Sequence, residues 1–270
     1  MLKTIVAAGI VVALLYAVAY RMRRSSMFFP EKYPSGMWET RALRIQPSDH
    51  TFQTGDGVTL HGWLFKAAAS SAPLIVWFHG NGGNITYRAE TAVGLADRGV
   101  SVFLFDWRGY GRSEGYATES GLYRDAVAAY DYAARSIGAG RIVAYGESLG
   151  GPYAAYVARH RKVRCVVIEN SFPSLRDLGN ALYAPIPIGW TAPWAMPATR
   201  WLNDANVPVL VMHGRRDTVI PFRLGQAFYD GLHVPKEMFV SDIADHSGIP
   251  SAEGARYYET VARFIAQHDH

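Results

Sequence analysis

The feature that most constrains the fold of this 270-residue chain is the alternation of short apolar runs with longer amphipathic stretches. Runs such as residues 73–78 are almost continuously apolar, which is typical of strands buried on both faces of a parallel sheet. Stretches such as residues 121–135 place apolar side chains at helical spacing. The alternation predicts an α/β fold, with a mostly parallel central sheet and helices on both faces. Further strands are expected at 58–66, 100–105, 141–145, 164–168, 207–212 and 237–240, and further helices at 85–98, 222–232 and 253–267.

Ser148 lies between Gly146 and Gly150, where an expected strand meets an expected helix. This G-x-S-x-G spacing is typical of a sharp turn that admits only small neighbours and exposes the serine hydroxyl. The N-terminus of the following helix offers N–H groups and a partial positive charge to a developing anion. Because Gly and Ser are common in any strand-to-helix loop, the assignment depends on partner residues elsewhere in the chain.

A glycine-rich loop, WFHGNGGN at residues 77–84, follows the strand expected at 73–78. It lacks the G-K-[ST] ending of a phosphate-binding P-loop. We predict instead an oxyanion hole formed by the backbone N–H groups of Asn81 and of Leu149, the residue after Ser148. His79 is expected to brace this loop rather than to act as a base.

Two further residues at strand ends complete a catalytic set. Asp217 follows the strand expected at 207–212, and His246 lies between the last strand and the last helix. A carboxylate at Asp217 would accept the Nδ1–H of a histidine and hold its tautomer. Glu169 also ends a strand and is the rival acid, but it lies in no motif. The order Ser, Asp, His is the one expected of an α/β-hydrolase.

Five motifs together resemble the α/β-hydrolase superfamily, and more narrowly its membrane-anchored, serine-aminopeptidase-like branch. The resemblance covers about residues 27–265 and implies Ser148 as nucleophile, Asp217 as acid and His246 as base. One departure is the Ser-Gly pair after His246, where this branch is expected to carry Asn-Asp or a similar pair. The motifs are HGNGGN (79–84), DWRGYGRSEG (106–115), GESLGG (146–151), HGRRD (213–217) and ADHSG (244–248).

These residues predict a serine hydrolase that cleaves a carboxylic ester or thioester through an acyl-enzyme, with no metal or organic cofactor. Two alternatives remain open. One is a serine peptidase of short peptides, for which Glu147 beside the nucleophile is the candidate acidic group. The other is a non-catalytic scaffold on the same fold. The expected partner is a small-molecule or lipid-like acyl substrate.

Residues 171–205 interrupt the alternation and contain four prolines between Pro185 and Pro197. The segment is too long for a simple connection and too apolar for a solvated linker. With Trp190, Trp194 and Trp201 it predicts a lid that favours apolar acyl chains. The alternative is an ordinary surface excursion packed on the domain.

The N-terminal residues 4–20 carry no charged side chain, and Lys3 and the cluster Arg21, Arg23 and Arg24 flank them. A membrane-spanning helix needs ~17–25 apolar residues, so this run is at the short end of the range. We predict a transmembrane anchor with a basic flank at 1–24, followed by a hydrolase domain at 25–270. The basic flank favours a cytoplasmic catalytic domain. The alternative is export after cleavage at the A-x-A site at 17–19.

Composition excludes several other classes. The net charge of +4 comes without a basic stripe interleaved with aromatics, so nucleic acid is not an expected partner. The nine histidines show no metal-ligand spacing. The single cysteine, Cys165, excludes an intrachain disulfide and lies in an apolar run, where it is expected to be a buried core residue.

Overall fold

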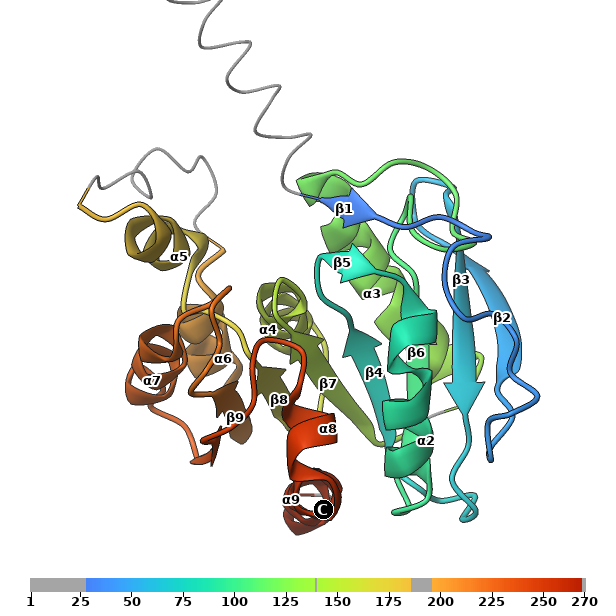
Figure 1. The fold of residues 1–270 in the computed structure, drawn as a ribbon. Helices are drawn as coiled ribbons and strands as arrows, with labels where there is room; N and C mark the ends of the chain where they lie inside the picture. Colours follow the sequence, from blue (N-terminus) through green and yellow to red (C-terminus); the bar gives the residue numbers. More distant parts are fainter. Residues whose placement is uncertain (1–27, 139, 186–195, 269–270) are drawn as a thin grey trace, which may run out of the picture.

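The computed structural model describes residues 28–138, 140–185 and 196–268. Within these residues, eight strands form one sheet that runs through the middle of the molecule (Figure 1). Strand β3 is antiparallel to both of its neighbours, and every other neighbouring pair is parallel. The order is β10 (Lys236–Ser241), β9 (Val209–Gly214), β8 (Val166–Glu169), β7 (Ile142–Glu147), β4 (Leu74–Phe78), β6 (Ser101–Phe105), β3 (Thr59–Phe65) and β2 (Ser48–Gln53).

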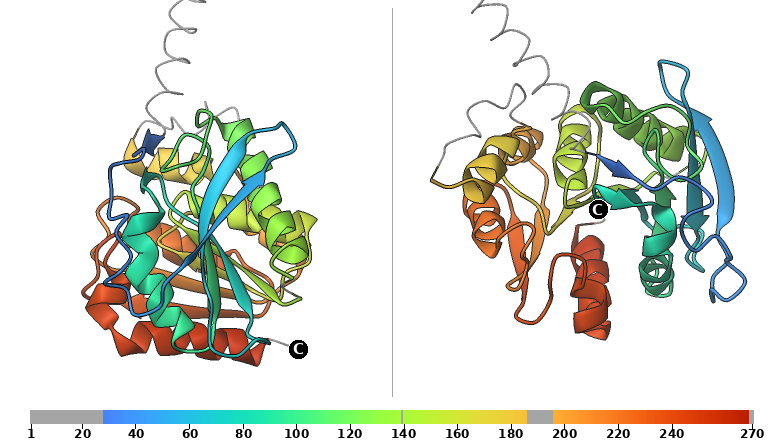
Figure 2. Two further views of the ribbon diagram at one scale, coloured as in Figure 1. Left: turned by 90° about the vertical axis from the view of Figure 1, so that its right-hand side faces the viewer. Right: turned by 45° about the horizontal axis from the view of Figure 1, so that its top comes forward.

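Helices cover both faces of the sheet, as Figure 2 shows from two further sides. One layer is built from α3 (Glu119–Arg135), α4 (Gly150–His160), α6 (Ala198–Ala205) and α7 (Phe222–Asp230). The opposite layer holds α2 (Ala89–Ala96), α8 (Ile249–Glu253) and α9 (Ala255–Gln267), with the short 3₁₀ helix η1 (Ile85–Arg88) leading into α2. The predicted α/β architecture is confirmed.

The sheet has an apolar core on each of its two faces, which explains why its strands could be predicted from the sequence. All five residues of β4 are buried, because helices pack against both of its faces. Alternate side chains contribute to opposite cores: Val76 and Phe78 pack with the α3–α4 layer, and Ile75 and Trp77 pack with the α2–α9 layer. Cys165, directly before β8, is fully buried as expected.

The segment predicted as a lid divides into parts with different positions. Its first helix, α5 (Leu175–Leu182), stands above the carboxyl ends of the strands, whereas α6 packs on α4 within the body of the domain (Figure 1). Trp201 lies on α6 and contacts the rings of Tyr123 and Tyr156. The expectation that Trp201 belongs to the cover over the site is therefore wrong, since its ring is used in packing between helices. Residues 186–195, with Trp190 and Trp194, lie outside the described residues.

A short strand, β1 (Phe29–Pro30), lies away from the main sheet and pairs with β5 (Gly82–Gly83). The pairing fixes the start of the described chain against the glycine-rich loop. Two backbone hydrogen bonds to Gly111 extend this attachment: the Tyr33 N–H donates to the Gly111 carbonyl, and the Gly111 N–H donates to the Glu31 carbonyl.

The predicted N-terminal anchor, residues 1–24, also lies outside the described residues. Among the helices of the described part of the chain, none is both long enough and apolar enough to cross a membrane.

Candidate active site

Ser148 occupies a strained turn between β7 and α4. Its φ of 53° is in the left-handed region, which is costly for a residue with a side chain. The turn is held by its surroundings: the Ser148 N–H donates to the Glu169 carbonyl (2.8 Å), and its carbonyl accepts from the Ser171 hydroxyl (2.8 Å). These bonds fix the hydroxyl at the carboxyl edge of the sheet, where the sequence predicted it.

The two flanking glycines are required by close backbone approach. A Cβ on Gly146 would lie 2.6 Å from Cα of Gly151, and one on Gly150 would overlap the carbonyl oxygen of Phe78. Neither neighbour is a flexible side chain that could move aside. The elbow therefore depends on glycine at both positions, as the spacing indicated.

His246 and Asp217 join Ser148 in one hydrogen-bonded chain. His246 Nε2 lies 2.9 Å from Ser148 Oγ, and His246 Nδ1 lies 2.7 Å from Asp217 Oδ2. The loop that carries His246 is fixed by Asn170, whose side-chain amide donates to the His246 carbonyl (2.6 Å). With Nδ1–H donating to the carboxylate, Nε2 is left to accept the serine proton.

The second oxygen of Asp217 is held by the turn that follows β9. Its Oδ1 accepts from the backbone N–H groups of Val219 (2.9 Å) and Ile220 (2.7 Å). Burial alone would raise the pKa of Asp217, but hydrogen bonds from His213 and His246 outweigh it and hold that pKa well below the ordinary value. Asp217 is therefore ionised and can orient His246 and stabilise its protonated form.

The rival acid, Glu169, has a different environment. It is buried and accepts hydrogen bonds from the hydroxyls of Tyr145 and Tyr257. Burial, together with the neighbouring Glu147, raises its pKa to about 7. The hydrogen bonds of Glu169 go to the two tyrosines, whereas Asp217 bonds to the His246 imidazole, so the geometry favours Asp217 as the orienting carboxylate.

The two residues predicted as oxyanion donors line the same pocket as Ser148. Leu149 immediately precedes α4, and Asn81 lies in the glycine-rich loop. The loop approaches the nucleophile closely, since a Cβ on Gly80 would be 3.3 Å from Cβ of Ser148. Asn81 is fixed by Tyr110, whose hydroxyl donates to its carbonyl (2.8 Å), and by the Phe29 N–H, which donates to its Oδ1 (3.2 Å).

His79 has the bracing role expected of it. It is fully buried, and its Nδ1 lies 2.8 Å from the Gly80 carbonyl. Its ring packs against Trp107 and Tyr110. Burial lowers the pKa of His79 to about 3, which keeps the imidazole neutral.

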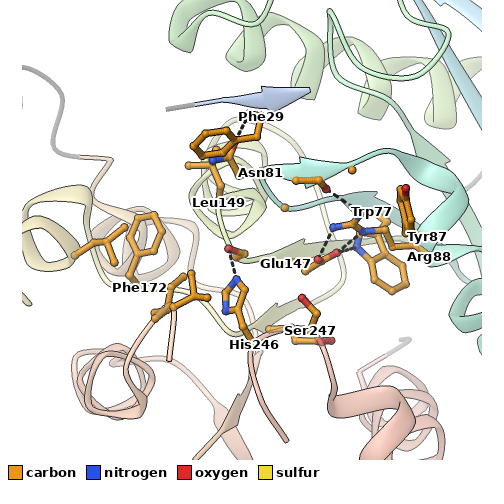
Figure 3. A pocket seen from close by; sticks show the side chains of 18 of the residues that line it. Phe29, Trp77, Asn81, Tyr87, Arg88, Glu147, Leu149, Phe172, His246 and Ser247 are labelled. Carbon is orange, nitrogen blue, oxygen red and sulfur yellow. Dashed lines mark hydrogen bonds and ion pairs between the residues drawn. The ribbon is translucent and has the colours of Figure 1, made fainter. Parts of the chain in front are cut away.

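The pocket around Ser148 has a volume of about 650 Å³ and two chemically different sides. Figure 3 shows Phe172 on one side of His246, and Glu147, Arg88 and Trp77 on the other. The apolar side is lined by Phe172, Leu175, Leu178, Leu182, Val219 and Ile220. The polar side is lined by Glu31, Trp77, Tyr87, Arg88, Thr91, Glu147, Glu169 and Ser247.

Arg88 is the site residue that the sequence did not indicate. Its guanidinium forms a bidentate pair with Glu147, through Nε (2.9 Å) and Nη2 (2.7 Å). Trp77 Nε1 donates to the same carboxylate (3.3 Å). Burial opposes ionisation of Glu147, but Arg88 lowers the pKa of this carboxyl to about 2. Because the Glu147 carboxylate is already paired with Arg88, it is a poor site for the α-ammonium group of a peptide.

No group of three or more His, Cys, Asp or Glu side chains is arranged to hold a metal ion within the described ranges. The site does bring together a serine, a histidine and a carboxylate, next to backbone N–H groups. Such a set can form and hydrolyse an acyl-enzyme.

Comparison with known proteins agrees with this architecture. A family model for the alpha/beta hydrolase fold matches residues 73–185. An uncharacterized protein of Mycobacterium tuberculosis is 30% identical over 268 residues, which cover 97% of this chain and 92% of that protein. The chain therefore belongs to the α/β-hydrolase family.

Two further proteins match this chain over most of their length. Protein bem46 of Schizosaccharomyces pombe is 26% identical over 264 residues, covering 91% of this chain and 87% of that protein. The structure of the Pyrococcus furiosus esterase Pf2001 aligns with a TM-score of 0.74 at 22% identity, covering 91% of this chain and 99% of that one. At that identity the likeness shows the fold alone.

Proposed function

We propose that this protein is a serine hydrolase that cleaves carboxylic esters or thioesters with an apolar acyl group. The observation that carries the proposal is the hydrogen-bonded chain Ser148–His246–Asp217 at the boundary of an apolar pocket wall. The esterase named among the structural neighbours is consistent with this class of reaction.

The first half-reaction acylates the enzyme. His246 Nε2 takes the Ser148 proton as Oγ forms a bond to the acyl carbon, and the carbonyl π electrons move to its oxygen. The N–H groups of Asn81 and Leu149 stabilise this oxyanion, and each such donor typically lowers a barrier by ~2.7–4 kcal/mol. When the intermediate collapses, the bond to the leaving group breaks and His246 gives its proton to the departing oxygen or sulfur.

The second half-reaction releases the acid. His246 Nε2 takes a proton from a water molecule, whose oxygen attacks the acyl carbon of the Ser148 ester. Collapse breaks the bond to Oγ, and the proton returns from His246 to Ser148. Asp217 remains ionised throughout, because its partners keep the pKa low.

The shape of the pocket supports an apolar acyl group. Leu175, Leu178 and Leu182 recur on α5 at spacings of three and four residues, so they share one face of the helix. All three line the pocket. An alkyl chain lying against this face would lose contact with water, which contributes about 0.8 kcal/mol per buried methylene group.

A membrane tether is part of the proposal and rests on sequence. The uncharged run at residues 4–20, with basic residues on both sides, would hold the catalytic domain at the cytoplasmic face of a bilayer. A tethered site meets membrane-borne acyl chains at a high effective concentration.

A fluorophosphonate probe, which reacts with activated serine hydroxyls, tests the function. We expect it to label the wild-type protein and not Ser148→Ala, whose ester turnover falls by at least about 10³-fold. Ser136→Ala, an exposed serine far from the pocket, serves as the control and keeps full labelling. Equal labelling of Ser148→Ala and wild type would refute the assignment of the nucleophile.

A further inference from the structure

Ser247 is the first residue of the Ser-Gly pair that departs from the expected motif, and it lines the pocket. It directly follows His246 and lies toward Glu147 rather than toward Phe172 (Figure 3). His246 must deliver a proton to the leaving group, which therefore departs within reach of this loop. The residue after His246 is thus well placed to contact the leaving group.

The division of the pocket gives the two halves of a substrate different surroundings. An apolar acyl chain gains from the wall formed by Phe172, Leu178 and Val219 and gains little from the polar side. With the acyl chain on the apolar side, the leaving group faces Ser247, Tyr87 and Glu147. This assignment rests on the proposed function, since it takes the acyl group to be apolar.

The charges on the polar side decide which leaving group fits. Among the described residues that line the pocket, Arg88 is the only lysine or arginine. Its guanidinium already makes four hydrogen bonds: two to Glu147, one to the Gly82 carbonyl (3.1 Å) and one to the Asn84 carbonyl (3.2 Å). A bound anion would find this cation engaged and would face carboxylates instead. Phosphorylated leaving groups are therefore disfavoured.

A leaving group with a fixed positive charge would also find no free carboxylate among the described residues on the polar side of the pocket. The carboxylate of Glu147 is neutralised by Arg88, Glu169 is buried with its hydrogen bonds to Tyr145 and Tyr257, and Glu31 accepts a hydrogen bond from the Tyr87 hydroxyl. What this side presents is a set of hydroxyl groups and carbonyl or carboxylate oxygens with spare lone pairs, including those of Ser247 and Tyr87. Hydroxyl groups, which donate and accept, complement such a surface.

We propose that the side of the pocket formed by Ser247, Tyr87 and the Arg88–Glu147 pair is a subsite for an uncharged, hydroxyl-rich leaving group of the glycerol type. The enzyme would then cleave acyl esters of polyols in preference to esters of apolar alcohols. Ser247 is the specificity-determining residue in this assignment.

Four octanoyl substrates that differ only in the leaving group test the proposal on the full-length protein: 1-octanoylglycerol, propyl octanoate, octanoylcholine and octanoyl-coenzyme A. We expect the kcat/KM of the glycerol ester to exceed that of the propyl ester by about tenfold, as one or two net hydrogen bonds allow. The choline ester and the coenzyme A thioester should both fall below the glycerol ester.

Two variants separate a loss of leaving-group recognition from a general loss of activity. Ser247→Ala should reduce the ratio of glycerol ester to propyl ester by about fivefold. Leu178→Ala, on the apolar side, is the matched control: it should lower kcat/KM for both esters and leave their ratio unchanged. Ser247→Ala with an unaltered ratio would overturn the role of Ser247.

The outcomes distinguish failure of the polyol subsite from failure of the proposed serine hydrolase function. Cleavage of the octanoyl esters with the propyl, choline or coenzyme A substrate preferred would overturn the polyol subsite and leave the serine hydrolase intact. Failure to cleave any of the four, together with no labelling by the fluorophosphonate probe, would remove both.

Discussion

At the residue scale, the orienting role proposed for Asp217 is the most direct one to test by mutation. Asp217→Asn places an amide where His246 Nδ1–H needs an acceptor, so the imidazole is held in the wrong tautomer. We expect kcat to fall by about 10⁴-fold. Glu169→Gln should cost far less, because Glu169 bonds to tyrosines rather than to the imidazole. Ester turnover of the two variants checks the ranking, and the reverse order would transfer the acid role to Glu169.

Glu169 itself predicts a pH dependence of stability. Its pKa is about 7 in the folded protein and 4.5 ordinarily, so between these values the folded state keeps a proton that the unfolded chain has lost. Stability therefore falls as pH rises across this window, by about 3 kcal/mol in total, and stays reduced above it. Glu169→Gln cannot ionise and should escape this loss.

Chemical denaturation of the wild type and Glu169→Gln at pH 5 and pH 8 measures the effect. The free energy of unfolding of the variant, relative to wild type, should be higher at pH 8 than at pH 5 by about 2.5 kcal/mol, since pH 5 already lies slightly above the ordinary pKa. Glu259→Gln, at an exposed position, controls for the removal of one carboxylate. A difference between wild type and Glu169→Gln that does not change with pH would contradict burial as the cause.

Single residues also show what the sequence could predict about the site. Ser148, Asp217 and His246 were predictable because each lies in a short motif at the end of a strand, and the ends of parallel strands meet at one edge of the sheet. Arg88 was not, because its partner Glu147 lies 59 residues away and no local pattern links them. The division of the pocket into two sides arises from such long-range pairs, so only the structure revealed it.

At the scale of elements, the glycine-rich loop depends on its neighbours for its position. Tyr110 holds Asn81 through its hydroxyl, and removing that hydroxyl loosens the loop that carries an oxyanion donor. We expect Tyr110→Phe to lower kcat by about tenfold while KM stays near the wild-type value, since the loop acts on the transition state. Tyr130→Phe is the matched control, because the Tyr130 hydroxyl bonds to Lys162 at a remote position. A loss confined to KM would argue against this role.

Helix α5 predicts a dependence on acyl chain length. Its leucines line the pocket, so kcat/KM should rise from acetyl to octanoyl esters, by up to roughly fourfold per methylene group covered. Leu178→Ala should flatten the rise by removing part of this wall. Val127→Ala, on α3 and away from the pocket, is the control for a shortened side chain. A profile in the wild type that is flat or falls with chain length would contradict an apolar acyl site.

The elements that could not be predicted from the sequence are those defined by contacts with distant parts of the chain. The main strands were predictable because burial on both faces makes them continuously apolar. The two-residue strand β1 is too short to show any periodicity, and only its pairing with Gly82–Gly83 defines it. Helix α6 has an amphipathic pattern of its own, but whether Trp201 faces the pocket or α4 depends on tertiary packing that local sequence does not encode.

At the scale of the whole molecule, the predicted anchor has a test independent of catalysis. Cells that express the full chain should retain the protein in the membrane fraction, with residues 4–20 present in the mature N-terminus. The catalytic domain should resist protease added from outside. Soluble protein that begins near Tyr20 would indicate a cleaved signal peptide instead, and protease cleavage with the anchor intact would reverse only the orientation.

The attachment of β1 to the glycine-rich loop sets a limit on distance. Phe28 is already buried in the domain, so at most the residues from Arg21 to Phe28 separate the predicted span from the catalytic body. Fully extended at about 3.5 Å per residue, they reach roughly 28 Å. With residues 4–20 spanning a membrane, as proposed, the active site would stay within a thin layer next to the bilayer and would meet esters there rather than in solution. Diffusion of the substrate in two dimensions would then govern how often the enzyme meets it.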